Sequence, residues 1–128
     1  MSDLQITQSA NSYQQTVARL ERELANRGLN VFARIDHAAN ARTVGLRMPA
    51  TIVVTFGSRL TGIPLMIHTP DLALDLPLRV LIRQTDHGVE LVSTDPTALL
   101  ERYGLPPASA APLTGIKTII TAAAGSRP

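Results

Sequence analysis

Residues 78–93 read LRVLIRQTDHGVELVS and predict two antiparallel strands joined by a tight turn. Residues 78–84 place apolar side chains on one face, and residues 89–93 form a second β-like run. Between them lies Asp86-His87-Gly88, in which Asp starts the turn and Gly accepts a positive φ. The hairpin places Glu90 across from Arg83, so the two side chains can pair. We therefore expect an antiparallel sheet as the framework of the fold.

Further strands are expected on the N-terminal side of this hairpin. Residues 51–56, TIVVTF, are β-branched and almost continuously apolar, which is typical of a strand covered on both faces, and Gly57 ends it. Residues 31–36 are also β-like, with Val31, Ala33 and Ile35 expected on one face. Residues 4–8 predict a short first strand, and residues 44–48 a short strand or extended segment.

The clearest helix signal lies near the N-terminus. Ser12 followed by Gln15 fits a capping box, in which each side chain satisfies a free backbone N–H. An apolar stripe at helical spacing follows, and Gly28 supplies a residue that tolerates positive φ, so we expect a helix over residues 13–27. Asp36 is a natural N-cap for a single helical turn over residues 37–42.

Three more helical segments follow along the chain. Residues 62–76 predict one helix or two pieces, with Pro64 in the first turn and a break near Thr69. Asp95-Pro96 is an N-cap and N1 pair that opens a helix ending at Gly104, and residues 113–124 predict a last helix. The expected fold class is α+β: one domain over residues 1–128, a mostly antiparallel sheet, and helices on one face.

Composition restricts the classes of function. The 128 residues include no cysteine, which excludes disulfides, thiolate metal sites and cysteine nucleophiles. The net charge is +2, but the basic residues are spread singly and aromatic residues are few, so we expect no nucleic-acid partner. No apolar run approaches the ~20 residues of a membrane span, so we expect no membrane association and a cytoplasmic protein.

Two histidines suggest chemistry. Asp36-His37 places a carboxylate beside an imidazole, and such a pair can orient a general base or hold a ligand. The simpler interpretation is that Asp36 caps the following turn and His37 fills a polar niche. His68, if it approaches His37, completes part of a metal site, although no HxH or HxxxH spacing supports one. The sequence identifies no metal or other cofactor.

A second group of candidates follows the most buried strand. Phe56 and Gly57 end that strand, where a glycine allows close backbone approach, and Arg59 is placed to receive an anion. Arg79 adds another guanidinium group at the start of the hairpin. The alternative for this loop is a tight turn without a ligand.

The chain resembles the domain of unknown function 302 family over about residues 5–122. The resemblance is carried by short motifs in a characteristic order: Gly28-Leu29-Asn30-Val31-Phe32, Ile35-Asp36-His37, Phe56-Gly57, Pro64-Leu65-Met66, and Ala73-Leu74-Asp75-Leu76-Pro77. It implies a TATA-binding-protein-like α+β fold and a homodimer, and it implies no activity. The family usually has Phe-Gly-Asn-Pro-Lys after the central strand, whereas this chain has Phe-Gly-Ser-Arg-Leu.

Three functional hypotheses remain open. The first is a homodimeric binding module for a small polar or anionic molecule, with Asp36, His37, the 56–59 loop, His68 and Arg79 as candidate contacts. The second is an enzyme that uses the Asp36–His37 pair, with or without a metal at His68. The third is an interaction or scaffold subunit that acts through its dimer surface.

Overall fold

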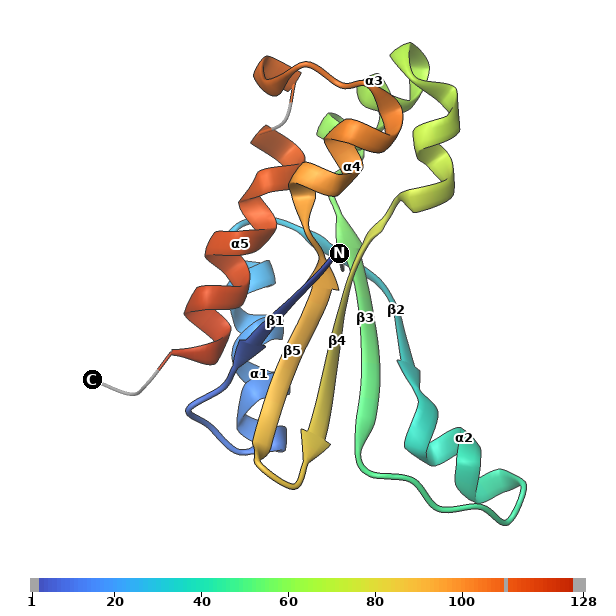
Figure 1. Cartoon of the computed structure of the whole chain (residues 1–128), viewed down its shortest axis with the longest axis vertical. Helices are drawn as coiled ribbons and strands as arrows, with labels where there is room; N and C mark the ends of the chain where they lie inside the picture. Colours follow the sequence, from blue (N-terminus) through green and yellow to red (C-terminus); the bar gives the residue numbers. More distant parts are fainter. Residues whose placement is uncertain (1–2, 110, 126–128) are drawn as a thin grey trace.

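The computed structural model describes residues 3–109 and 111–125 and shows an α+β domain (Figure 1). Five strands form one antiparallel sheet in the order β1-β5-β4-β3-β2. The strands are β1 (Leu4–Gln8), β2 (Asn30–Asp36), β3 (Thr51–Gly57), β4 (Leu78–Thr85) and β5 (Gly88–Thr94). The helices are α1 (Tyr13–Asn26), α2 (His37–Thr43), α3 (Arg59–His68), α4 (Pro96–Tyr103) and α5 (Ala111–Ala124), with short 3₁₀ helices η1 (Pro70–Asp75) and η2 (Pro107–Ser109).

The expected hairpin is confirmed and sets the register of the sheet. β4 and β5 pair antiparallel from Leu81 opposite Val92 to Thr85 opposite Gly88. Arg83 and Glu90 face each other, and their side chains form an ion pair at 2.9 Å. β1 adds to the outer edge of β5, and β3 and β2 add beyond β4.

The N-terminal helix is confirmed together with its capping box. The Gln15 backbone N–H donates to Ser12 Oγ at 3.2 Å, and the Ser12 N–H donates to Gln15 Oε1 at 3.2 Å. At the other end, Gly28 has φ 68° and the Leu29 N–H donates to the Leu24 carbonyl. These contacts satisfy backbone groups that have no partner inside the helix.

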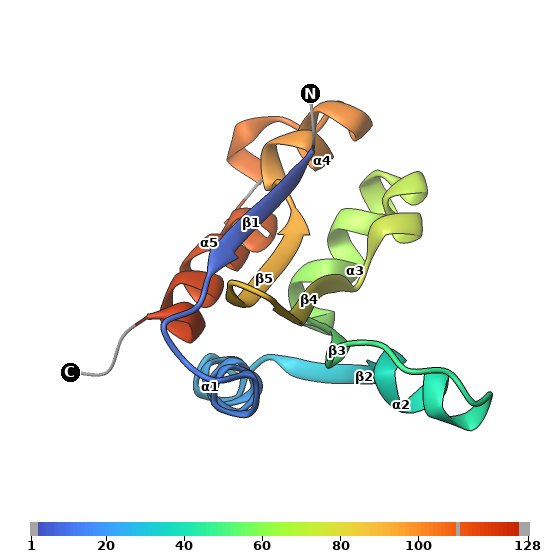
Figure 2. The ribbon, with the colours of Figure 1, turned by 60° about the horizontal axis from the view of Figure 1, so that its bottom comes forward.

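Helices α1 and α5 pack together on one face of the sheet (Figure 2). Beneath them lies one hydrophobic core, which includes Leu20 and Leu24 of α1, Ile116 of α5, and Val54 and Val80 of the sheet. The expected placement of the helices on one face is confirmed. In the part of the chain that the structure describes, no helix layer covers the opposite face.

A β-bulge changes the facing of β2. The register with β3 shifts between Val31 and Ala33, so Val31 pairs with Phe56 on the core side while Ala33 pairs with Thr55 on the opposite side. The expectation that Val31 shares a face with Ala33 and Ile35 is therefore wrong. One extra residue, Phe32, reverses the alternation along the rest of the strand.

β3 is also less covered than its apolar sequence predicts. Val54 and Phe56 are buried beneath the helices, whereas Val53 on the other face is only half-buried. Residues 44–48, expected as a strand or extended segment, form a turn at Val44 and Gly45 followed by chain without regular structure. They pair with no strand and leave Val44 and Leu46 exposed.

The segment after β3 divides into two pieces at Thr69, as expected. Helix α3 begins at Arg59, three residues earlier than the expected start, so Pro64 lies inside the helix rather than in its first turn. α3 and η1 stand beyond one end of the sheet, and α2 projects beyond the other (Figure 1). Within the described residues, the helices fall short of the length and hydrophobicity needed to cross a membrane.

Candidate functional site

An apolar cavity of about 250 Å³ lies where β3 ends and α3 begins. We call it the α3 pocket. Its walls come from the end of β3, from α3, from the residues that enter β4, from β2 and from the start of α5. The lining residues are Phe32, Phe56, Gly57, Ser58, Arg59, Thr61, Gly62, Ile63, Leu65, Met66, Leu76, Pro77, Leu78, Pro112 and Leu113.

The inner wall of the α3 pocket is built from core residues. Phe56 and Leu113 are each only 1% exposed, so both belong to the buried core. At the strand end, a Cβ built on Gly57 would lie 3.6 Å from Phe32 Cε2. The chain therefore turns into α3 directly beside an aromatic ring.

The charged residue among those lining this pocket is Arg59. Its guanidinium carbon lies 5.7 Å from the centroid of the Phe32 ring, a cation–π contact that holds the charge beside the apolar cavity. The side chain is otherwise exposed. Ser58, the N-cap residue of α3, makes no side-chain hydrogen bond to the helix. The polar groups of the pocket therefore gather where the loop joins α3.

A second cavity of about 340 Å³ adjoins the first and shares part of its wall. Phe56, Gly57 and Leu78 line both cavities. The second cavity extends toward the end of α1, where Arg27 forms an ion pair with Glu23 at 3.4 Å. Arg59 lines the first cavity and Arg27 lines the second.

The Asp36–His37 pair lies at the other end of the sheet. Asp36 caps α2, accepting a hydrogen bond from the Ala39 N–H at 2.8 Å, and it pairs with Ile52 near the start of β3. His68 ends α3, which follows the opposite end of β3. From Ile52 to Gly57 the strand runs about 17 Å at 3.4 Å per residue. The structure thus separates His37 from His68, and the described residues contain no group of three or more metal-ligating side chains.

Arg79 also lies outside the α3 pocket. Its side chain lies on the face of β4 that Leu78 does not share, and its Nη2 atom is 3.9 Å from Asp75 Oδ1. Asp75 accepts hydrogen bonds from Tyr103 Oη and from Arg102 Nη1, the latter at 2.9 Å. The hydrogen bond from Tyr103, supported by Arg102, lowers the pKa of Asp75 although burial opposes the shift, and the pKa of Tyr103 is raised chiefly by the same hydrogen bond. This cluster joins η1 to α4.

Of the seven candidate residues, the structure brings Phe56, Gly57 and Arg59 together in one pocket. Sequence reasoning missed Phe32 and Leu113, which reach the pocket only through tertiary packing. It did contain a signal for the α3 wall, because the motif Pro64-Leu65-Met66 is part of the family resemblance and supplies Leu65 and Met66.

Comparisons with known proteins place this geometry in a family context. Residues 5–123 match the family described as "Domain of unknown function DUF302". A protein of Brucella suis biovar 1 (strain 1330), named "Fluoride-specific ion channel FluC 1", is 36% identical over 97% of this chain and 51% of its own length. A protein of the same name from Brucella abortus biovar 1 (strain 9-941) is also 36% identical, over 48% of its length. The chain spans about half the length of these curated relatives.

A solved structure shares the fold. The crystal structure of an uncharacterized conserved DUF302 protein from Bacillus stearothermophilus superimposes with a TM-score of 0.80, covering 97% of both chains at 15% sequence identity. At that identity the likeness shows the fold alone.

Proposed function

The chain belongs to the DUF302 family, whose description names no activity, and on this premise we propose that it is a binding module for a small amphipathic anion. The ligand has an apolar body, which occupies the α3 pocket, and a carboxylate or similar group, which meets Arg59. The observation that carries the proposal is the cavity of about 250 Å³ with a guanidinium group beside it.

The chemistry of the lining supports this class of ligand. Ligand pockets are usually apolar, with a few polar groups that fix orientation, and drug-sized ligands occupy about 300–1,000 Å³. A cavity of about 250 Å³ suits a smaller molecule, such as a medium-chain or single-ring carboxylate. A guanidinium group matches the geometry of a carboxylate and can bind both of its oxygens.

The same lining favours binding over catalysis. No histidine, aspartate or glutamate occurs among the described residues that line the α3 pocket. General acid–base catalysis needs such a group within hydrogen-bond reach of the reacting atoms. The Asp36–His37 pair of the enzyme hypothesis lies at the far end of β3, where Asp36 is engaged as a helix cap.

The names of the Brucella relatives raise fluoride as another ligand. They are called fluoride-specific ion channels, and the matching segment makes up about half of their length. Fluoride is a small, strongly hydrated anion with no apolar part, and transferring it into an apolar cavity costs free energy without a compensating contact. We therefore assign the α3 pocket to an amphipathic anion, and fluoride enters the experiment as a separate probe.

The proposal includes a cytoplasmic homodimer. The absence of cysteine is consistent with a reducing compartment. Several large hydrophobic side chains remain exposed on the single chain, and contiguous exposed apolar surface often marks an interface.

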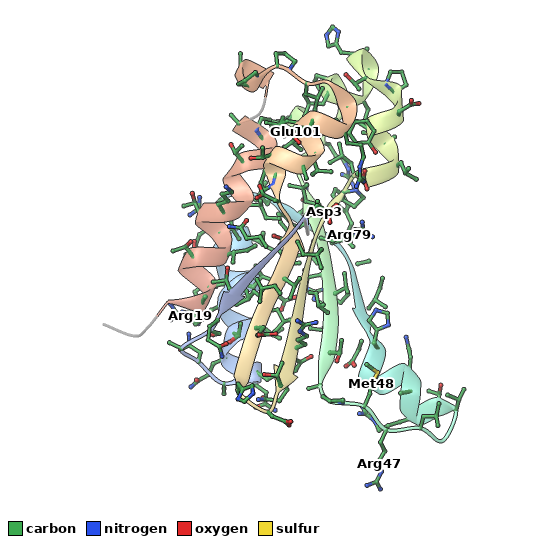
Figure 3. The ribbon with its side chains drawn as sticks, in the orientation of Figure 1. Asp3, Arg19, Arg47, Met48, Arg79 and Glu101 are labelled. Carbon is green, nitrogen blue, oxygen red and sulfur yellow. The ribbon has the colours of Figure 1, made fainter. Side chains whose placement is uncertain are left out.

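Thermal-shift and calorimetric titration with octanoate, octanamide and sodium fluoride tests the binding function. We expect octanoate to raise the melting temperature and to bind about tenfold more tightly than the neutral octanamide. Arg59→Gln removes this difference, whereas Arg47→Gln retains it, because Arg47 extends away from the molecule beyond α2 (Figure 3). Gly62→Leu adds a bulky side chain to the pocket lining, because Gly62 is one of the lining residues and a Cβ there meets no atom within 4 Å. Octanoate binding that is unchanged in Gly62→Leu, or absent from the unsubstituted protein, would overturn the proposal.

A further inference from the structure

The face of the sheet opposite α1 and α5 carries a continuous apolar row. Ile6 of β1 pairs with Val92 of β5, Val92 with Leu81 of β4, Leu81 with Val53 of β3, and Val53 with Ile35 of β2. Residues that are directly opposite on neighbouring strands share a face, so these five side chains lie side by side across the whole sheet. We call them the open-face row.

The exposure of this row increases toward the sheet edges. Ile6 is 54% exposed and Ile35 is 40% exposed, whereas Leu81 and Val53 are half-buried and Val92 is buried by its neighbours. Other large hydrophobic residues are also exposed, and two of them, Phe32 and Ile63, line the α3 pocket. These residues come from β1, β2, the 44–48 segment, α3 and η1, and among the described residues α1, α4 and α5 contribute none. They are Leu4, Phe32, Val44, Leu46, Met48, Leu60, Ile63, Ile67 and Leu74.

We propose that the open-face row is the interface at which two copies of this chain pack sheet against sheet. This inference rests on the proposed homodimer and names its surface. Across the strands the row reads Ile–Val–Leu–Val–Ile, the same sequence from either edge. A two-fold axis along β4 through Leu81 therefore places Ile6 against the partner copy's Ile35, and Val92 against its Val53. A two-fold interface requires such self-complementarity.

The charges beside the row are compatible with a second copy. Arg83 and Glu90 are paired within the chain at 2.9 Å, and Arg79 approaches Asp75 at 3.9 Å. Arg83 thus brings its own carboxylate, whereas Arg79 shares Asp75 with Arg102, which contacts the same carboxylate at 2.9 Å. The Arg83–Glu90 pair therefore needs no compensating charge from the partner copy.

The area of the face is close to the minimum for a specific pair. Five strands about 4.8 Å apart and about 20 Å long give a face of about 500 Å² in each copy. Packing two such faces removes about 1,000 Å² from water, which is near the lower bound for a specific interface. A second layer also covers Val53 of β3, which the single chain leaves half-buried.

Light scattering after size exclusion, at about 50 μM protein, tests the interface. We expect a dimer for the unsubstituted chain and for Leu60→Asp, whose side chain is 88% exposed on α3 outside the row. Leu81→Asp, which places a charge on the axis, should give a folded monomer. Ile6→Asp places a charge at an exposed position of the row and should also give a folded monomer. This variant tests the interface if Leu81→Asp does not fold.

A charge exchange tests the position of the axis. Ile6→Asp combined with Ile35→Lys should restore the dimer, because each introduced charge faces the opposite charge on the partner. Within one chain the two positions are about 19 Å apart, across four strand spacings, so they cannot pair with each other. A monomeric unsubstituted chain, a dimeric Ile6→Asp variant, or failure of the exchange to restore the dimer would overturn the inference. Octanoate titration of the monomeric variants measures ligand binding at the α3 pocket, so the binding proposal is tested independently of the dimer.

Discussion

The guanidinium group of Arg59 rests on the ring of Phe32, with 5.7 Å between the guanidinium carbon and the ring centroid. The two residues come from different elements: Arg59 begins α3, and Phe32 is the extra residue of the β2 bulge. The bulge places an aromatic ring at the end of the sheet, where it holds a cation beside an apolar cavity. This contact links an irregularity of the strand to the proposed ligand-binding function.

Replacing the ring should weaken anion binding without unfolding the protein. Phe32→Leu removes the contact that positions Arg59, and an exposed cation–π contact contributes about 0.5–1 kcal/mol. We expect the affinity for octanoate to fall about two- to fivefold by calorimetric titration, with a smaller change for octanamide. Phe32→Tyr keeps an aromatic face and should keep the affinity. Equal losses in the Leu and Tyr variants would contradict this role of the ring.

Gly62 offers a test of the space beneath α3. The residue lies inside a helix, where glycine is about 0.5–1 kcal/mol less favourable than alanine, and its added Cβ would meet no atom within 4 Å. Gly62→Ala should therefore raise the free energy of unfolding by about that amount in urea denaturation.

Gly104→Ala is the matched control for this substitution. Gly104 ends α4 with φ 62°, in the left-handed region, so the same added methyl group should lower the free energy of unfolding by about 1 kcal/mol. A loss of stability in Gly62→Ala would show that the pocket wall has no room for a methyl group.

Much of this fold can be predicted from local sequence signals. The Ser12–Gln15 capping box, the Gly28 helix end and the Asp86-His87-Gly88 turn each depend on residues a few positions apart, and each is present in the structure. The bulge at Phe32 has no such signal, because the extra residue leaves the composition of the strand unchanged while it reverses the facing of residues 33–36.

The candidate site can be predicted from the sequence only in part. Phe56, Gly57 and Arg59 are recognisable because a glycine at a strand end marks close backbone approach. Phe32 and Leu113 are brought to the same pocket by sheet pairing and helix packing, which no short motif encodes. Asp36 and His37 are adjacent in sequence and suggest an acid–base or ligand-binding pair. In the structure the Asp36 carboxylate instead accepts a hydrogen bond from the Ala39 N–H at the start of α2.

Two substitutions at Asp36 separate a capping role from a chemical one. The Ala39 N–H donates to Asp36 Oδ1 at 2.8 Å, and an asparagine oxygen can accept the same hydrogen bond. Asp36→Ala should lower the free energy of unfolding by about 1 kcal/mol, whereas Asp36→Asn should retain most of it. Octanoate binding should be unchanged in both variants. Loss of binding in a stable Asp36→Asn protein would instead assign the carboxylate a role in the site.

Asp75 should make the stability of the protein depend on pH in the acid range. Hydrogen bonds from Tyr103 and Arg102 lower the pKa of Asp75 in the folded state, so folding favours its charged form. The unfolded chain then binds a proton at a higher pH than the folded chain does. The stabilisation is accordingly complete above the unfolded pKa, near 4, and is lost as the pH falls through the folded pKa.

Urea denaturation at pH 7, 5 and 3 measures this effect as the difference between the unsubstituted chain and Asp75→Asn. We expect Asp75→Asn to be less stable at pH 7 and 5 by a constant amount, because the charged hydrogen bonds to Arg102 and Tyr103 are weakened. At pH 3, below the unfolded pKa near 4, the difference should shrink, because the unfolded form of the unsubstituted chain then binds a proton at Asp75. Asp71→Asn, an exposed carboxylate in the same 3₁₀ helix, serves as the control and should show a smaller effect at every pH. A difference for Asp75→Asn that is the same at pH 3 as at pH 7 would mean that the cluster joining η1 to α4 does not depend on the charge of Asp75.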